Sequence, residues 1–210
     1  MYLINNIDEL DSPALVVYPG IVKENIDAAI AMVGNVQRLR PHVKTHKSAD
    51  VTKLMLAAGI QKFKCATIAE AEMLALCGAG DVLLAYQPVG PKIARLVQLT
   101  QQYPNTQFSC LIDNADSAMA IAKTFAQAGS TIPVYIDLNI GQNRTAIAPR
   151  EKALQLYNYC AQLTGLAMAG LHAYDGHIRI TDMKERTAAV EAAFAPVLAM
   201  QKNLQSMGYY

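Results

Sequence analysis

Apolar and polar positions are arranged in alternating blocks along most of the chain. Short apolar stretches typical of buried β-strands start 19 to 34 residues apart. Between them, apolar residues recur at the i, i+3, i+4 and i+7 spacing of helices that cover a sheet. The pattern predicts repeated β/α units and a parallel sheet. The predicted strands are residues 36–44, 62–67, 81–86, 107–113, 134–139 and 168–175, and a further run at 13–18 also has strand character.

Helix-capping signals support this division of the chain. Ser48 precedes an amphipathic stretch, and Thr67 followed by Glu70 forms the pattern of a capping box. Asp113 or Asn114 is expected to open the next helix. A last helix is predicted over 183–206, and it should kink or break at Pro196 because proline lacks a backbone N–H.

A basic row in the segment RLRPHVK favours a barrel over an open sheet. On a strand, Arg38, Arg40, His42 and Lys44 would share one face. In an open sheet with helices on both sides, both faces are buried, and burying such a row of charged side chains is costly. A (β/α)8 barrel instead has a ligand-binding mouth at the carboxyl ends of its strands, where charged side chains can lie. We therefore expect an α/β fold of the TIM-barrel type. It would be incomplete, because about six barrel strands are found, or seven with 13–18.

Composition and charge narrow the class of protein. The chain has 210 residues, is 52% hydrophobic and 17% charged, and carries a formal net charge of +1. We therefore expect no nucleic-acid partner and no membrane partner. The cysteines show no CxxC spacing, and the N-terminus has no signal-peptide pattern, so a cytoplasmic protein with free thiols is expected. The cysteines are Cys65, Cys77, Cys110 and Cys160.

Four segments in order resemble a known family. SPALVVY, RLRPHVKTHK, IDLNIGQNRTA and GLHAYDGH are similar to the N-terminal part of fold type III pyridoxal-phosphate enzymes. The likeness is to the D-threonine aldolase and D-serine dehydratase group, within the superfamily of alanine racemase. It implies that Lys44 forms the Schiff base with pyridoxal 5'-phosphate and that Arg144 lies near the phenolic oxygen of the cofactor. It also implies that Tyr174 lies against the pyridine ring and that His177 lies near the substrate.

The residues themselves agree with a cofactor site but leave alternatives open. A lysine attacks an aldehyde only as the neutral amine, a form that the neighbouring basic groups, His42 among them, would favour. Gln87 ends a strand at the same mouth, where it contacts the cofactor or caps a loop. Asp137 lies in an apolar run, so we expect it to be buried and to orient a neighbour.

The segment HAYDGH contains His172, Asp175 and His177, but their spacing suits neither a strand face nor a helix face. No metal site is therefore expected from this segment alone. The resemblance instead implies a divalent metal, manganese or zinc, with ligands outside this chain.

The resemblance also predicts a domain division. Residues 1–20 would form an N-terminal strand segment that belongs to a second β-domain, and residues 21–210 a partial pyridoxal-phosphate barrel. The C-terminal β-domain and the phosphate-binding segment of the family would be absent, which indicates a fragment or a truncated product.

The most concrete functional hypothesis is a lyase that cleaves D-threonine-like β-hydroxy amino acids to glycine and an aldehyde. A D-serine dehydratase, an amino-acid racemase and a non-catalytic pyridoxal-phosphate binding protein remain alternatives, as does an anion-binding barrel without cofactor. The resemblance further implies a homodimer that acts on a small amino-acid substrate.

Overall fold

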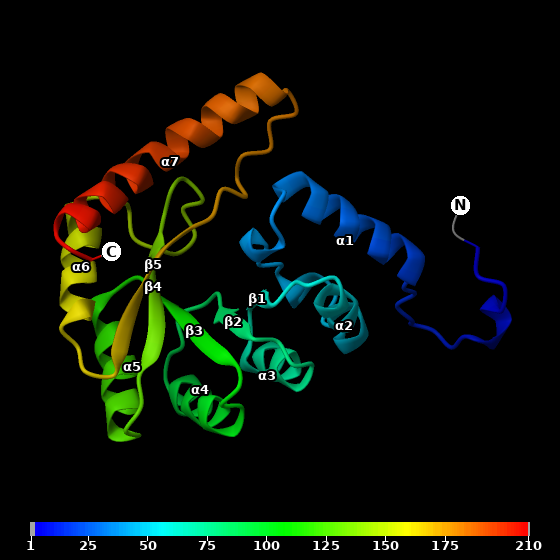
Figure 1. Ribbon diagram of the computed structural model, residues 1–210, viewed down its shortest axis with the longest axis horizontal. Helices are drawn as coiled ribbons and strands as arrows, with labels where there is room; N and C mark the ends of the chain where they lie inside the picture. Colours follow the sequence, from blue (N-terminus) through cyan, green and yellow to red (C-terminus); the bar gives the residue numbers. More distant parts are fainter. Residues whose placement is uncertain (1–2, 210) are drawn as a thin grey trace.

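The computed structural model describes residues 3–209. Its centre is one sheet of five parallel strands in the order β1-β2-β3-β4-β5, so each strand pairs with its neighbour in sequence (Figure 1). The strands are β1 (Lys62–Cys65), β2 (Asp81–Leu84), β3 (Gln107–Ile112), β4 (Ile132–Leu138) and β5 (Leu166–Ala173). The expectation of an α/β fold built from β/α repeats is confirmed.

Helices alternate with the strands, and the predicted caps are present. The Ser48 side chain accepts from Val51 N, the Thr67 side chain from Glu70 N, and the Asn114 side chain from Ser117 N. The α-helices are α1 (Pro19–Val33), α2 (Ala49–Ala57), α3 (Ile68–Leu76), α4 (Pro91–Gln102), α5 (Ala115–Gln127), α6 (Glu151–Ala161) and α7 (Met183–Ser206). Short 3-10 helices are η1 (Ile7–Glu9), η2 (Val36–Arg38) and η3 (Val43–Thr45).

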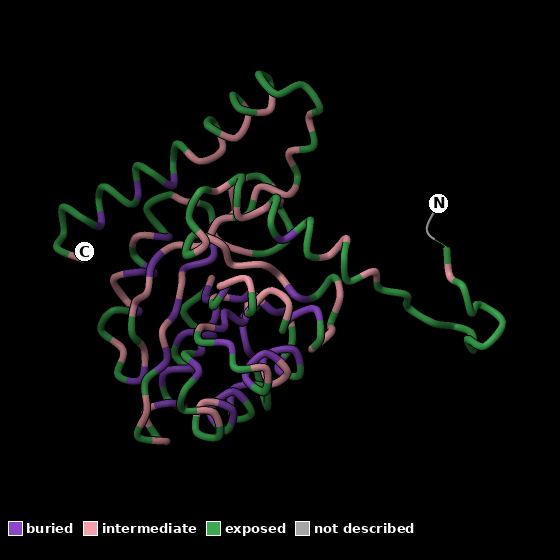
Figure 2. The backbone as a smooth tube through the Cα atoms, turned by 45° about the vertical axis from the view of Figure 1, so that its right-hand side comes forward, coloured by how far each residue is buried: buried purple, intermediate pink, exposed green. Residues whose placement is uncertain are grey.

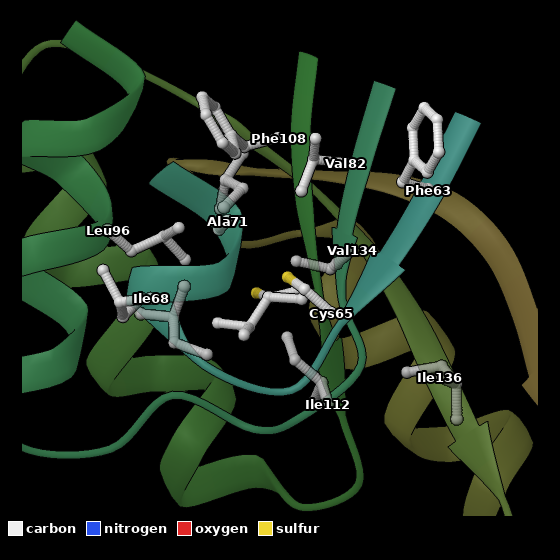
Figure 3. Close-up of a cluster of buried hydrophobic side chains, with 14 of the residues drawn as sticks. Phe63, Cys65, Ile68, Ala71, Val82, Leu96, Phe108, Ile112, Val134 and Ile136 are labelled. Carbon is white, nitrogen blue, oxygen red and sulfur yellow. The ribbon is translucent and has the colours of Figure 1, made fainter. Parts of the chain in front are cut away.

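The core lies between the sheet and helices α3 to α6. Alternate strand residues, among them Phe63, Cys65 and Ile136, point toward the helices and are fully buried (Figure 3). Ile68, Ala71 and Leu96 pack against them from the helix side. This helix-facing side is called the outer face below, and the opposite side of the sheet is called the inner face.

The predicted strand at 36–44 is wrong. Its residues form η2, an extended piece and η3, and only one β-bridge joins them to the sheet, between His42 and Lys64. Lys64 N donates to Pro41 O at 2.8 Å. Pro41 has no N–H to continue a ladder, so the segment lies beside β1 in parallel without becoming a sixth strand.

The predicted strand at 13–18 is also wrong. Residues 14–18 have no regular structure, and they lie in an N-terminal arm that runs away from the body of the molecule (Figures 1 and 2). Leu15, Val16 and Val17 are exposed. A strand needs a partner for its backbone groups, and no described segment supplies one here.

Helix α7 continues through Pro196, so the break expected there is absent. Val197, Met200 and Leu204 are buried in the C-terminal half of the helix. Their packing holds this half in place despite the missing backbone hydrogen bond.

Candidate active site

Lys44 stands on the 3-10 turn η3, close to the carboxyl edge of the sheet. Val43 beside it is fully buried and anchors the turn, whereas the Lys44 side chain is exposed. His42 caps the turn, because its Nδ1 accepts from Lys44 N at 3.2 Å. Within residues 3–209, no hydrogen bond or ion pair engages Lys44 Nζ. The turn therefore presents the Lys44 side chain to solvent without a partner among the described residues.

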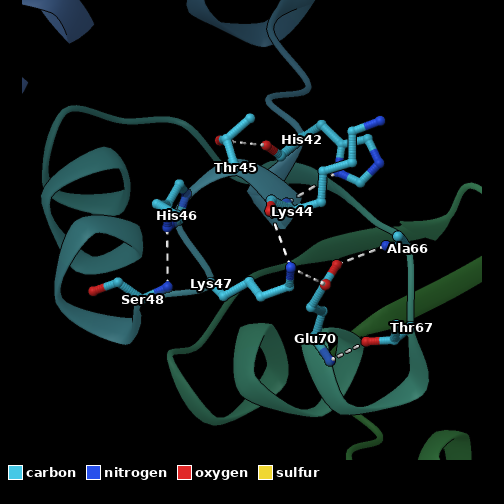
Figure 4. Close-up of polar contacts among 9 residues, drawn as sticks. All are labelled: His42, Lys44, Thr45, His46, Lys47, Ser48, Ala66, Thr67 and Glu70. Carbon is cyan, nitrogen blue, oxygen red and sulfur yellow. Dashed lines mark hydrogen bonds and ion pairs between the residues drawn. The ribbon is translucent and has the colours of Figure 1, made fainter. Parts of the chain in front are cut away.

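The end of this turn is tied to the N-terminus of α3 (Figure 4). Lys47 has a φ of 49°, an uncommon value for a residue with a side chain, and its Nζ donates to Lys44 O at 3.3 Å. The same ammonium lies 4.0 Å from Glu70 Oε1. Glu70 is buried, and its Oε2 accepts from Ala66 N at 2.7 Å. The backbone around Lys44 is thus fixed while its side chain is not.

The basic row predicted to share one face does not form. Arg38 lies in η2, and Arg40 forms two hydrogen bonds of 2.6 Å with Asp81, at the amino end of β2. Burial and the nearby ammonium groups of Lys44 and Lys64 lower the pKa of His42 to about 4. His42 is therefore neutral at neutral pH and adds no positive charge beside Lys44. The expectation of a cationic His42 is corrected on this ground.

The inner face of the sheet carries a chain of polar side chains. Lys64 Nζ lies 2.9 Å from His172 Nε2, and His172 Nδ1 lies 2.7 Å from Asp137 Oδ1. Gln87 Nε2 donates to Asp137 Oδ2 at 3.1 Å. Asp137 is buried and orients His172, as expected, and Gln87 is engaged by Asp137.

Lys64 was missed by the sequence reasoning. The signal was present in KFKC, where lysines alternate with Phe63 and Cys65 and so face away from the core. Burial lowers the pKa of Lys64, and the cations of Arg40 and Lys44 lower it further, against the opposing effect of Asp137.

Two loops at the carboxyl edge carry the remaining predicted residues. Arg144 is exposed in the loop after β4, and no ion pair with Asp137 or Glu151 holds it. The His177 ring lies against Gly141 so closely that a Cβ at position 141 would collide with Nε2 of that ring. Tyr174 is 46% exposed, and its ring folds over Gly176. The contact of His177 with Gly141 brings the loop after β5 to the loop that bears Arg144.

Not all predicted residues meet. Within the described chain, no hydrogen bond or ion pair joins Lys44 to Arg144, Tyr174 or His177. No group of three or more His, Cys, Asp and Glu residues within 3–209 is placed to hold a metal ion. A cavity of about 240 Å³ lies on the outer side, between the start of α3 and helix α4, and none of the predicted site residues lines it.

Comparison with known proteins places this arrangement in a family. A model of the alanine racemase N-terminal domain matches residues 19–209. The chain belongs to the alanine racemase N-terminal domain family. This membership confirms the resemblance drawn from the four segments and agrees with the TIM-barrel type of fold.

Two curated proteins are similar to this chain in sequence. A D-threonine aldolase from Arthrobacter sp is 29% identical over 196 residues, which cover 93% of this chain and 51% of the relative. A 3-hydroxy-D-aspartate aldolase from Paracoccus denitrificans (strain Pd 1222) is 27% identical over 207 residues, or 95% of this chain and 52% of the relative. The chain spans about half the length of the curated relatives it matches.

Two solved structures superpose well on this chain. The D-threonine aldolase from Filomicrobium marinum gives a TM-score of 0.87 at 29% identity, over 96% of this chain and 55% of that structure. A D-threo-3-hydroxyaspartate dehydratase from Delftia sp. HT23 gives 0.84 at 24% identity, over 95% and 53%, which bears on the fold alone. Among residues 3–209, none of the helices combines the length and apolar character needed to cross a membrane.

Proposed function

We propose that the chain forms the pyridoxal-phosphate-binding part of a lyase for D-β-hydroxy amino acids. The preferred reaction is retro-aldol cleavage of a D-threonine-like substrate to glycine and an aldehyde. The observation that carries the proposal is the unengaged amine of Lys44, on a fixed turn beside a neutral His42. Family membership and the named relatives support the substrate class.

The residues at the carboxyl edge fit an anionic aromatic aldehyde. Lys44 supplies the amine that would hold the aldehyde carbon, and no carboxylate within residues 3–209 forms an ion pair with that amine. The exposed Arg144 guanidinium would hold the phenolic oxygen, and the exposed ring of Tyr174 would pack against the pyridine. When bound, pyridoxal phosphate supplies an electron sink for the bond that breaks at the substrate Cα.

The contacts of His42 and Gln87 restrict the roles that these two residues can have in the site. His42 would line the site as a neutral ring, because its pKa is about 4. Gln87 would act through Asp137, to which its amide donates. The resemblance assigns acid–base work to His177, which is exposed at the rim of the site.

The dehydratase, racemase and non-catalytic binding hypotheses remain alternatives within this proposal. The proposal includes a cytoplasmic location and a homodimer. Sedimentation analysis of the purified protein would test the homodimer, for which we expect twice the mass of one chain. It keeps the division into residues 1–20 and 21–210 as a prediction.

The first test is a covalent label rather than an assay. The full-length protein is mixed with pyridoxal phosphate, reduced with borohydride, digested and analysed by mass spectrometry. We expect the label on the peptide with Lys44, and its loss in Lys44→Ala. Lys53→Ala is the matched control, because Lys53 is an exposed lysine on α2 whose Nζ lies 3.5 Å from Asp50 Oδ1. A label that is absent from Lys44 in the intact protein refutes the cofactor site.

A second prediction concerns metal. The proposal includes manganese or zinc, bound by ligands outside these 210 residues. We expect dialysis against a chelator to lower glycine formation from D-threonine at least ~10-fold, and either metal to restore it, because an ion at the substrate hydroxyl would stabilise developing negative charge. The Lys44 label should persist after chelation. Full activity in chelator would exclude a metal from the proposal.

A further inference from the structure

The cavity on the outer side of the sheet has no role in the proposed cofactor site. Its volume is about 240 Å³, and none of the residues assigned to the cofactor lines it. It lies where the start of α3 faces α4, two helices that stand side by side (Figure 1). Pockets for drug-sized ligands usually measure roughly 300–1,000 Å³, so this cavity suits a smaller molecule.

The floor of the cavity is apolar and its wall is fixed. Ile68 and Leu84 are buried core residues, and Pro88 is buried as well. In the loop after β2, Tyr86 N donates to Leu84 O at 2.8 Å, and Tyr86 O accepts from Leu111 N at 3.4 Å. These bonds hold the loop in place without a ligand. The cavity is therefore preformed, and a molecule that enters it needs little rearrangement of the protein.

Two cations and an aromatic ring line the same cavity. Lys92 and Arg95 are three positions apart on α4, so their side chains lie on one face of the helix. Lys92 Nζ lies 5.1 Å from the centroid of the ring of Tyr86, which is 45% exposed. Within residues 3–209, no ion pair joins either cation to a carboxylate. The described chain therefore leaves the positive charge at this cavity uncompensated.

We propose that this cavity binds a compact organic carboxylate with an apolar body. The apolar part would lie on the buried floor, against the ring of Tyr86. The carboxylate would face Lys92 and Arg95, and the planar guanidinium of Arg95 can bind both carboxylate oxygens at once. An inorganic anion would leave the floor unfilled, and a neutral molecule would leave the two cations unpaired. The inference does not depend on the proposed lyase activity.

The test is isothermal titration calorimetry of the full-length protein, loaded with pyridoxal phosphate, with benzoate as the probe. Benzoate should bind with a Kd on the order of 1 mM or lower. Acetate lacks the apolar ring and benzamide lacks the charge, so each should bind at least ~10-fold more weakly than benzoate. Arg95→Gln should weaken benzoate binding at least ~5-fold. Lys123→Gln, at an exposed position on α5, is the matched control and should change the Kd less than about twofold.

A second pair of variants separates binding in the cavity from attraction to surface charge. Ala69 lines the cavity at an exposed position of α3, so Ala69→Leu fills part of the space without changing the charge. We expect this variant to keep the melting temperature of the unmodified protein and to weaken benzoate binding at least ~10-fold. Ala120→Leu, at an exposed position of α5, is the matched control and should bind as before. Unchanged binding in Ala69→Leu would overturn the inference.

Three other outcomes would also overturn it. One is the absence of benzoate binding at about 10 mM, well above the expected Kd. Another is equal binding of benzoate and benzamide, which would show that the cations take no part. The third is loss of binding in Lys44→Ala, which would place the probe at the proposed cofactor site. The borohydride label on Lys44 judges the proposed function separately. A labelled protein without benzoate binding would refute this inference alone, and benzoate binding without a label would refute the proposed function alone.

Discussion

The two faces of the sheet differ in what their side chains contribute to the molecule. On β1, Phe63 and Cys65 point outward into the helix layer and are fully buried, whereas Lys64 points inward and bonds to His172. The same contrast recurs on β4, where Ile136 is outward and Asp137 inward. The outer face holds the fold together through apolar burial, and the inner face places charge and hydrogen bonds where a ligand would meet them.

The largest effect should come from the outer face. Phe63→Ala removes a fully buried ring and leaves a cavity among β1, α3 and their neighbours. We expect the free energy of unfolding to fall by about 3–5 kcal/mol, measured by urea denaturation. Lys62→Ala, the adjacent inward position, should cost less than about 1 kcal/mol. Equal losses in the two variants would show that the faces do not differ as described.

A smaller effect is expected from the buried carboxylate of the inner face. Asp137→Ala leaves His172 Nδ1 and the Gln87 amide without their acceptor. We expect a loss of about 2–3 kcal/mol in the free energy of unfolding, because both donors stay in a poorly solvated place. Asp27→Ala, at an exposed position on α1, is the matched control and should change stability by less than about 0.5 kcal/mol. A loss no larger than that of the control would mean that water replaces the carboxylate and that the polar chain is not rigid.

The sequence predicted the outer face better than the inner one. Five of the six strand stretches from residue 36 onward and the caps at Ser48, Thr67 and Asn114 were legible, because they depend on local periodicity and on side chains a few residues apart. The stretch 36–44 failed because alternation alone does not reveal whether a ladder can form, and Pro41 prevents one.

The candidate site was predictable only in part. Lys44 stood out through a motif, but the pairing of Arg40 with Asp81 and the neutrality of His42 depend on contacts that the fold creates. Lys64 was passed over because its partner His172 is 108 positions away, and nothing near Lys64 in sequence suggests an imidazole. The hydrogen bonds of the inner face join residues from strands that are far apart in sequence. They can therefore be predicted only once the strand order is known.

The smallest predicted effect is a pH dependence from the inner face. In the folded protein the pKa of His42 is about 4, below its ordinary value of 6.5, chiefly because of burial. Between these two values the unfolded chain binds a proton that the folded chain does not, so the free energy of unfolding falls as pH falls from 6.5 to 4. His42→Gln keeps an acceptor for Lys44 N but removes the titration. Denaturant midpoints measured across this window should therefore fall less steeply in His42→Gln than in the unmodified protein, with the two curves converging in shape above pH 6.5. Identical slopes would mean that His42 is solvated and protonates freely in the folded state, and that the inner face beside Lys44 is as open to water as the surface.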